Sequence, residues 1–448
     1  MSRSNSTRRF QLRSLIIAAA ILHVCVTLTV FMVGKYQLFP TQIYPTGIGR
    51  FAPDGLTYQT QLGELCNILK SEGPLAWATL PTQLHVRLYS LPLFPISRWV
   101  SFNILTIEPL NLLFYLAIIV LVFKLGDAIF NYQAGLMAAT VVAIWPSLLL
   151  HTTQLLRDPL LITAVLLLMW CLVDLIQHEL SWRRGLGIAF ASVVSLVTIR
   201  IVRLPMWYVV VAAVVAGVAL FGFRLIRERR FQPVAIGYAL LLIVAVALIP
   251  KFQPFFHNQQ VLGARRMIEN EEWQELPIEQ QIYGRREAFK YALDKEGEEA
   301  PSDDGSRIDS NVTLNSPGAI VGHLPRAIAI GFFAPFPNMW LRPGKQVGSS
   351  GRLVSGFETL FTYVIESMAL FGLWWRRRSL AAWLLAIVIC MGAVSLGLVV
   401  INMGAMYRLR YPFWVLMVVL GAGGALSLWQ RFRADTSADN FSGREVSI

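Results

Sequence analysis

Two aspartates stand in local sequences that favour exposed and reactive carboxylates. Asp54 lies in Pro53-Asp54-Gly55, where proline and glycine predict a turn that presents the side chain. Asp158 lies in Arg157-Asp158-Pro159, at the expected start of a helix. A carboxylate can act as a general base, and several together can hold a hard divalent cation. Each also has an ordinary interpretation, as a turn residue or as a helix cap.

Several arginines are placed where they could bind an anionic group. Those that we single out are Arg157, Arg200, Arg203, Arg408 and Arg410. The spacing of two residues in Arg408-Leu409-Arg410, within the expected turn Asn402–Pro412, should let both guanidinium groups gather in one place. Arginine forms bidentate hydrogen bonds with phosphate that lysine cannot form. The alternative is that these side chains extend to lipid headgroups or pair with acidic residues.

Aromatic side chains near these charges could border a substrate groove. The candidates are Tyr58, Tyr407 and Trp340, together with Phe333 and Phe336. Aromatic rings are common in ligand sites because they bury a large area with a fixed shape.

The composition restricts the elements that can position these residues. The chain has 448 residues, of which 55% are apolar and 15% charged, whereas soluble domains carry about 25% charged residues. A soluble enzyme of ordinary composition and a disordered protein are both excluded. The four cysteines, Cys25, Cys66, Cys171 and Cys390, are scattered without metal-ligand spacing. Neither a disulfide framework nor a zinc site is therefore expected.

Long apolar runs predict an all-α polytopic membrane protein with about ten transmembrane helices, because a helix that spans a bilayer needs about 20 apolar residues. The runs are 15–34, 107–123, 134–150, 159–177, 186–199, 205–223, 233–250, 354–374, 380–401 and 412–429. The run 319–340 is interrupted by prolines, and we interpret it as an interfacial or re-entrant helix.

The basic residues predict how these helices are oriented. Short connections rich in arginine, such as Arg224–Phe231 and Trp374–Ser379, alternate with two long segments, 35–106 and 251–353. Cytoplasmic loops carry the excess of Lys and Arg, so both termini should be cytoplasmic and both long segments should face outward. The net charge of +12 is then mainly an orientation signal, and nucleic acid is not an expected partner.

This topology divides the chain into five parts. They are a cytoplasmic tail (1–14), a catalytic module of seven spans with the outer loop 35–106 (15–250), an outer loop with an acidic segment and an interfacial helix (251–353), three spans (354–429) and a cytoplasmic tail (430–448). Ionisable residues also fall inside spans, where they are often functional. These are His23, Asp174, Glu358 and Glu366, and the sequence leaves their roles open.

A single helix followed by a long outer loop with Pro53-Asp54-Gly55, and a second outer aspartate after Trp145-Pro146-Ser147, resembles the GT-C class of glycosyltransferases that use polyprenyl-phosphate sugars. This class includes the protein O-mannosyltransferases and the lipid A aminoarabinose transferases. The resemblance covers roughly residues 10–250 in layout. It implies that Asp54 is the general base and that Asp158 orients the acceptor or the base, or binds a metal if one is used. Many relatives have an acidic pair where Gly55 follows Asp54 here, which weakens a metal role for this position.

The resemblance implies transfer of a sugar from a polyprenyl-phosphate donor to a lipid, glycan or protein acceptor, with inversion and on the non-cytoplasmic face. The arginines would stabilise the leaving phosphate. No cofactor is required by this chemistry, although an acidic oxygen site would suit Mg²⁺ or Mn²⁺. Sparse cysteines and short basic loops favour a bacterial inner membrane, with membrane lipids as partners. The alternatives are a polysaccharide polymerase or ligase with a diphosphate-linked donor, and a transporter or flippase of lipid-linked sugars.

Overall fold

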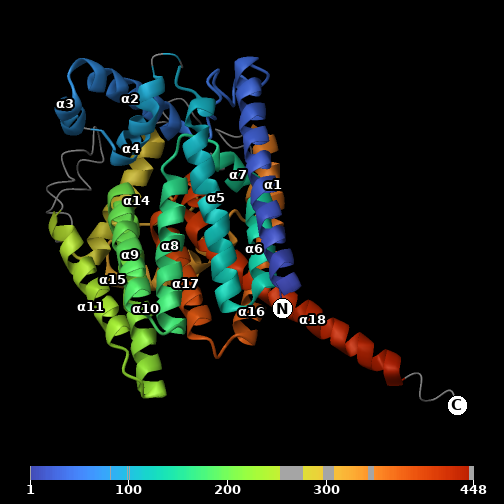
Figure 1. Cartoon of the computed structure of the whole chain (residues 1–448). Coiled ribbons are helices and arrows are strands. Elements are labelled where there is room, and N and C mark those ends of the chain that lie inside the picture. Colours follow the sequence, from blue (N-terminus) through green and yellow to red (C-terminus); the bar gives the residue numbers. More distant parts are fainter. Residues whose placement is uncertain are drawn as a thin grey trace.

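The computed structural model is all-α in the residues that it describes, which are 2–80, 82–97, 99, 101–252, 276–295, 307–341 and 348–442. Its long helices run side by side in one bundle (Figure 1). Within these ranges the only β pairing consists of two isolated bridges, Ile43 with Gly49 and Arg307 with Asn402. The predicted fold class is therefore confirmed.

The helices follow the predicted apolar runs and extend them by several residues. In chain order they are α1 (Ser2–Lys35), α2 (Pro53–Ser71), α3 (Pro74–Thr79), α4 (Leu84–Leu93), η1 (Phe94–Ile96), α5 (Ile104–Ile129), α6 (Tyr132–Ile144), α7 (Pro146–Thr152), α8 (Asp158–Gln177), α9 (Trp182–Val202), η2 (Leu204–Met206), α10 (Trp207–Glu228), α11 (Pro233–Leu248), η3 (Ile249–Phe252), α14 (Ile278–Lys295), α15 (Pro317–Phe333), η5 (Pro337–Met339), α16 (Gly348–Trp375), α17 (Leu380–Val399) and α18 (Met403–Ser442).

Nine helices of the described part are long and apolar enough to cross a membrane, and the pair α6 and α7 supplies a tenth. This pair is bent by 66° at Trp145, whereas the sequence predicted one straight span over 134–150. Pro146 occupies the first turn of α7. Since proline lacks a backbone N–H and clashes with the preceding turn, it favours a new helix start over continuation of α6.

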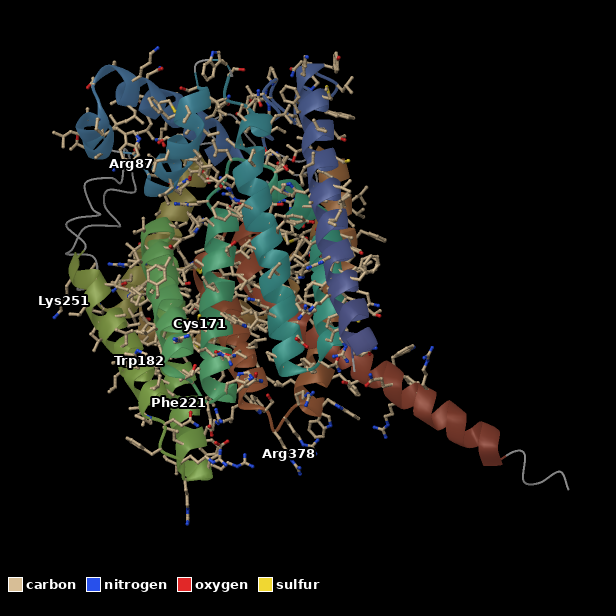
Figure 2. The ribbon with its side chains drawn as sticks, in the orientation of Figure 1. Arg87, Cys171, Trp182, Phe221, Lys251 and Arg378 are labelled. Carbon is tan, nitrogen blue, oxygen red and sulfur yellow. The ribbon has the colours of Figure 1, made fainter. Side chains whose placement is uncertain are left out.

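The two ends of the bundle differ in construction. The helices α2, α3 and α4 gather at one end, whereas the N-terminus and the exit of α18 lie at the other (Figure 1). Arg87 and Arg378 mark these two ends (Figure 2). We call the end with α2 the capped end and the end with Arg378 the arginine end. The start of α1 and the end of α18 therefore lie on the same side of the bundle, which agrees with the expected even number of spans.

Small residues let the helices of the bundle pack closely. A Cβ added to Gly424 of α18 would lie 2.0 Å from the carbonyl oxygen of Met368 in α16, and one on Gly331 of α15 would lie 2.1 Å from that of Ala393 in α17. Backbones that approach this closely are typical of helix pairs in membranes. The interrupted run 319–340 thus forms α15, a helix of 17 residues that packs along α17.

Two local predictions near the charged residues were wrong. Asp54 lies in the first turn of α2, not in a free turn, because Pro53 starts that helix. The segment Asn402–Pro412 is not a turn either, since α18 already begins at Met403. Much of the acidic segment in the loop 251–353, including Asp303-Asp304-Gly305, lies outside the described residues.

Candidate functional site

Asp54 and Arg408 form an ion pair at the capped end. The Nη2 atom of Arg408 in α18 lies 3.0 Å from Oδ2 of Asp54 in α2. The Asp54 side chain is 31% exposed and the Arg408 side chain only 12%. The pair therefore joins two elements that are 354 residues apart, and the Asp54 side chain stays partly exposed.

Asp158 lies deeper in the same cluster. Its Oδ1 atom is 3.3 Å from Nη1 of Arg203, and its Oδ2 atom is 3.9 Å from Nη1 of Arg408. The Asp158 side chain is only 3% exposed, so its charge must be balanced by these arginines. Arg408 thus lies between the two aspartates, and each aspartate can hold it in place for the other.

Prolines place the residues of this cluster at helix ends. Pro159 stands at the start of α8, directly after Asp158, where its fixed φ favours the helix. Pro205 cannot continue α9. That helix therefore ends at Val202, and Arg203 is its C-cap residue. Arg157 precedes α8, and its Nη1 atom donates to the carbonyl of Val202 at 3.4 Å. The ends of α8 and α9 are therefore tied together beside the aspartates.

His85 of α4 belongs to the same cluster, and sequence reasoning missed it. Its side chain is buried and its ring meets that of Tyr58 edge to face, with centroids 4.5 Å apart. Burial, and then the positive charge of Arg157, hold the pKa of His85 well below its usual value. A single histidine in Gln83-Leu84-His85-Val86 carries no motif, so only the packing of α4 against α2 could find it.

The positive charges of the cluster lie close together and repel one another. Burial is the main cause that lowers the pKa of Arg203 to about 9, and Arg157 adds to it, whereas Asp158 opposes both. Arg157, Arg203 and Arg408 outnumber Asp54 and Asp158 by one. An anionic ligand at the exposed side of Asp54 would relieve this excess.

The structure places the other predicted site residues elsewhere. Arg200 stays on α9 with its guanidinium over the ring of Trp207, at 5.5 Å from the centroid. Arg410 is buried and donates through Nη1 to the carbonyls of Phe332 and Ala334, at 3.0 and 2.8 Å. These two arginines therefore hold backbone and aromatic groups in place, and the structure does not bring them to Asp54.

The predicted groove aromatics separate in the same way. The Tyr58 ring packs beneath the cluster against His85. The Tyr407 hydroxyl donates to the carbonyl of Ser355 at 2.8 Å, and the indole of Trp340 donates to that of Pro335, also at 2.8 Å. Tyr407 and Trp340 thus fix α16 and the segment after α15, and only Tyr58 adjoins the aspartates.

The residues of the cluster do not fit a divalent cation. Within the described ranges, no three His, Cys, Asp or Glu side chains are grouped so that they could hold a metal ion. Asp54 and Asp158 would be the oxygen ligands, but Arg408 lies between them and Arg203 contacts the second. A cation in that position would meet two guanidinium charges at close range.

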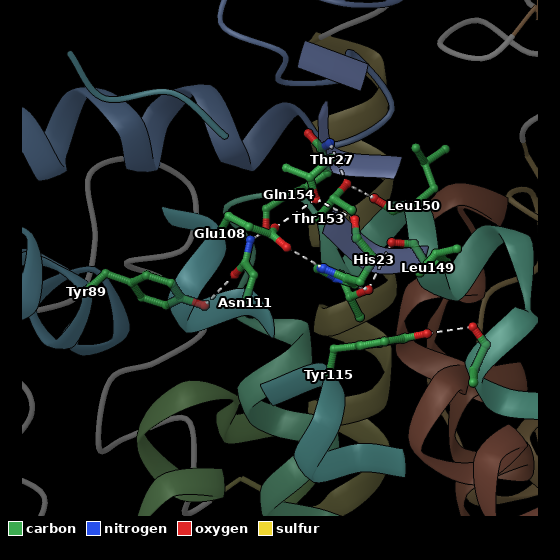
Figure 3. A network of polar contacts seen from close by, with 12 residues as sticks. His23, Thr27, Tyr89, Glu108, Asn111, Tyr115, Leu149, Leu150, Thr153 and Gln154 are labelled. Carbon is green, nitrogen blue, oxygen red and sulfur yellow. Dashed lines mark hydrogen bonds and ion pairs between the residues drawn. The ribbon is translucent and has the colours of Figure 1, made fainter. Parts of the chain in front are cut away.

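A buried polar network supports the segments that carry the two aspartates (Figure 3). The side-chain oxygen of Gln154 accepts from the backbone N–H of Gly49 at 2.8 Å, and its carbonyl accepts from Asn111 at 3.1 Å. Gly49 precedes Asp54 by five residues, and Gln154 precedes Asp158 by four. Gln154 therefore joins the approach to α2 with the approach to α8.

The same network fastens α1 to the bundle. Nδ1 of His23 in α1 lies 2.7 Å from Oε1 of Glu108 in α5, and Nε2 lies 3.1 Å from the hydroxyl of Thr152 in α7. The hydroxyl of Thr27 donates to the other oxygen of Glu108 at 2.8 Å. Polar groups in a membrane need hydrogen-bond partners within the protein. Here polar side chains of α1, α5 and α7 provide these partners for one another.

Comparisons with known proteins do not assign the chain to a family. No protein-family model matches the sequence, and no functionally characterised protein matches it either. The geometry of the cluster therefore carries the functional interpretation.

Proposed function

We propose that the chain is an integral-membrane glycosyltransferase that moves a sugar from a polyprenyl-phosphate donor to a lipid, glycan or protein acceptor. The observation that carries this proposal is the pairing of a partly exposed carboxylate, Asp54, with a cluster of three arginines. Glycosyl transfer needs both parts, since a base must take the proton of the acceptor hydroxyl and positive groups must stabilise the leaving phosphate.

The depth of the cluster agrees with a lipid-linked donor. Asp158 is the first residue of α8, Arg203 follows the last residue of α9, and Arg408 lies in the second turn of α18. The ends of spanning helices lie near the lipid headgroups. A sugar phosphate on a lipid carrier would present its phosphate at this level.

The reaction would proceed by exchange of partners at Arg408. The donor phosphate would take up the guanidinium groups and release Asp54 from its ion pair. The acceptor oxygen would then form a bond to the anomeric carbon while the bond from that carbon to the phosphate oxygen breaks. Asp54 would take the hydroxyl proton, and the arginines would balance the charge left on the phosphate, so that a single displacement inverts the anomeric centre.

A reconstitution assay tests this proposal. The purified chain is supplied with a panel of polyprenyl-phosphate sugars and membrane-extract acceptors, and sugar transfer is measured. Asp54→Asn should lower the rate by about 10²–10⁴-fold, and Arg408→Ala by about 10²–10³-fold. The matched controls are Glu64→Gln, an exposed acid on the same helix, and Arg50→Ala, an exposed arginine that stacks on Tyr44. Full activity of both site variants would refute the assignment.

One observation favours a second candidate, a polymerase or ligase with a diphosphate-linked oligosaccharide donor. The cluster holds one more arginine than aspartate, and this surplus suits a more highly charged leaving group. The two candidates separate in the same assay when monophosphate and diphosphate donors are compared. The polymerase or ligase would use only the diphosphate and would depend less on Asp54.

A further inference from the structure

A second cluster of arginines surrounds a cavity at the arginine end, far from Asp54. The cavity measures about 730 Å³ and is lined by Trp374, Trp375, Arg376, Arg377, Arg378, Ser379 and Arg431. These residues come from the end of α16, the connection to α17 and the distal part of α18. The volume is in the range of small-molecule sites, which is about 300–1,000 Å³.

In the part of the chain that the structure describes, the arginines of this cavity have no acidic partner, unlike other arginines of the same end. Arg184 pairs with Asp174, Arg224 with Glu228 at 3.0 Å, and Arg230 with Glu179 at 2.7 Å. Among the ion pairs found in the described ranges, none includes the four arginines that line the cavity. Four positive charges on one cavity attract an anionic ligand.

Two of these arginines are held in defined positions. Nη2 of Arg376 donates to the carbonyl of Phe130 at 2.8 Å, and its guanidinium lies over the Phe130 ring. The guanidinium of Arg377 lies 4.7 Å from the ring centroid of Trp374, and its carbonyl accepts from Trp383 at 2.8 Å. Such fixed groups lose little entropy when they bind an anion, which favours a specific site over a diffuse charge.

The position of the cavity matches a membrane surface. Trp375 ends the spanning segment of α16, and the next one begins at Leu380. Trp374 and Trp375 are exposed, and tryptophans of this kind lie at the boundary between hydrocarbon and headgroups. At this level the anionic headgroup of a lipid can reach the cavity while its acyl chains stay beside the apolar helices.

We propose that this cavity binds the headgroup of an anionic phospholipid. Its phosphate would contact Arg377, Arg378 and Arg431, and its acyl chains would follow the apolar surfaces of α16 and α18. The positive-inside orientation places this lipid in the cytoplasmic leaflet. The site is separate from the Asp54 cluster and does not depend on the proposed transfer reaction.

Lipid binding to the purified full-length chain in detergent tests this proposal. Native mass spectrometry with phosphatidylglycerol and with phosphatidylcholine would give the affinity for each lipid. Phosphatidylglycerol should bind about tenfold more tightly than phosphatidylcholine, and Arg377→Lys/Arg378→Lys should weaken phosphatidylglycerol binding about threefold although the net charge is unchanged. Arg377→Gln/Arg378→Gln should abolish the preference for phosphatidylglycerol.

The matched control is Arg183→Gln/Arg227→Gln, which removes two exposed charges from the same end outside the cavity. It should leave phosphatidylglycerol binding unchanged. Lysine variants that bind like the original chain, or a control that loses as much affinity, would show that only net charge matters and would overturn the proposal. Sodium phosphate that displaces phosphatidylglycerol at equal concentration would overturn it too, because the cavity would then bind a soluble anion.

Discussion

At the level of single residues, the cluster at the capped end is built from groups that destabilise one another. His85 is buried beside Arg157 and Arg203, and its pKa is lowered for that reason. Asp158 and Arg203 are buried together, a pairing whose desolvation cost can exceed its electrostatic gain. Buried charges that lower the stability of the fold are typical of functional sites.

His85 makes the stability of the fold depend on pH. Below about pH 6.5 an unfolded chain binds a proton at this histidine, whereas the folded chain does not until its lowered pKa is reached. The unfolded state then binds more protons, so the free energy of unfolding falls as the pH falls. His85→Gln should therefore reduce the loss of thermal stability between pH 7.5 and pH 5.5.

The control for this experiment is His178→Gln, at the other end of the bundle, where the side chain is 47% exposed. Thermal unfolding in detergent at both pH values gives the comparison. A His85→Gln variant with the same acid sensitivity as the original chain would contradict the assignment of this effect to His85.

Glu366 of α16 offers a second test at this scale. Both of its carboxylate oxygens are buried and have no hydrogen-bond partner in the part of the chain that the structure describes. Burial without a partner is costly, so Glu366→Met should raise the free energy of unfolding by about 1 kcal/mol. Glu358→Met should lower it, because Oε1 of Glu358 accepts from the backbone N–H of Ser147 at 2.8 Å. A destabilised Glu366→Met variant would contradict the prediction.

At the level of elements, helix geometry decides which predicted residues meet. Arg408 and Arg410 were expected to gather because two residues separate them in a presumed turn. On α18 the same spacing points them to different sides, Arg408 toward Asp54 and Arg410 toward the carbonyls of Phe332 and Ala334 at the end of α15. The spans could be predicted because length and hydropathy are local properties, whereas this distinction depends on where α18 begins.

The same reasoning separates Arg200 from Arg203. Their spacing predicts one face of a helix, but α9 ends at Val202 and only Arg203 turns toward Asp158. Pro205 predicts where α9 ends, but the direction of the residues that follow depends on contacts with α8. The role of His85 could not be predicted for the same reason, since its partners come from other elements and no local sequence pattern predicts them.

Close packing of α16 against α18 predicts that an added methyl group destabilises the fold at Gly424 but not at Gly222, which has open space around it. In Gly424→Ala the new methyl would lie 2.0 Å from the Met368 carbonyl, so the helices must separate, at a cost of about 1–3 kcal/mol. A Cβ at Gly222 of α10 meets nothing within 4 Å, and Gly222→Ala should stabilise by about 0.5–1 kcal/mol. Thermal unfolding measures both, and equal effects of the two substitutions would contradict this account of the packing.

At the level of the whole molecule, two arginine clusters of different kinds occupy one bundle, one beside α2 at the capped end and one that includes Arg378 at the opposite end (Figure 2). The cluster at the capped end pairs with aspartates, whereas within the described residues no acidic side chain pairs with the cluster at the arginine end. The difference fits a substrate site on one surface and a lipid contact on the other. Both interpretations require that the two ends face different compartments.

Site-directed labelling tests this orientation. Single cysteines replace Leu75 of α3, which is 78% exposed, and Arg378 in a background without native cysteines. A membrane-impermeant maleimide should label the first in intact cells and the second only in inverted vesicles, because basic loops remain cytoplasmic. Labelling of both positions from one side would contradict the topology, and the reverse pattern would place the Asp54 cluster in the cytoplasm.

One continuous helix, α18, joins both ends, since it carries Arg408 at the first cluster and Arg431 at the second. At about 1.5 Å per residue these two positions lie about 34 Å apart along the helix axis, close to the hydrocarbon thickness of about 30 Å. In a bilayer of shorter acyl chains the helix must tilt or the lipid must stretch. Either response moves both arginine clusters relative to the lipid headgroups. The length of the acyl chains should therefore affect the Asp54 cluster and the cavity at the arginine end together.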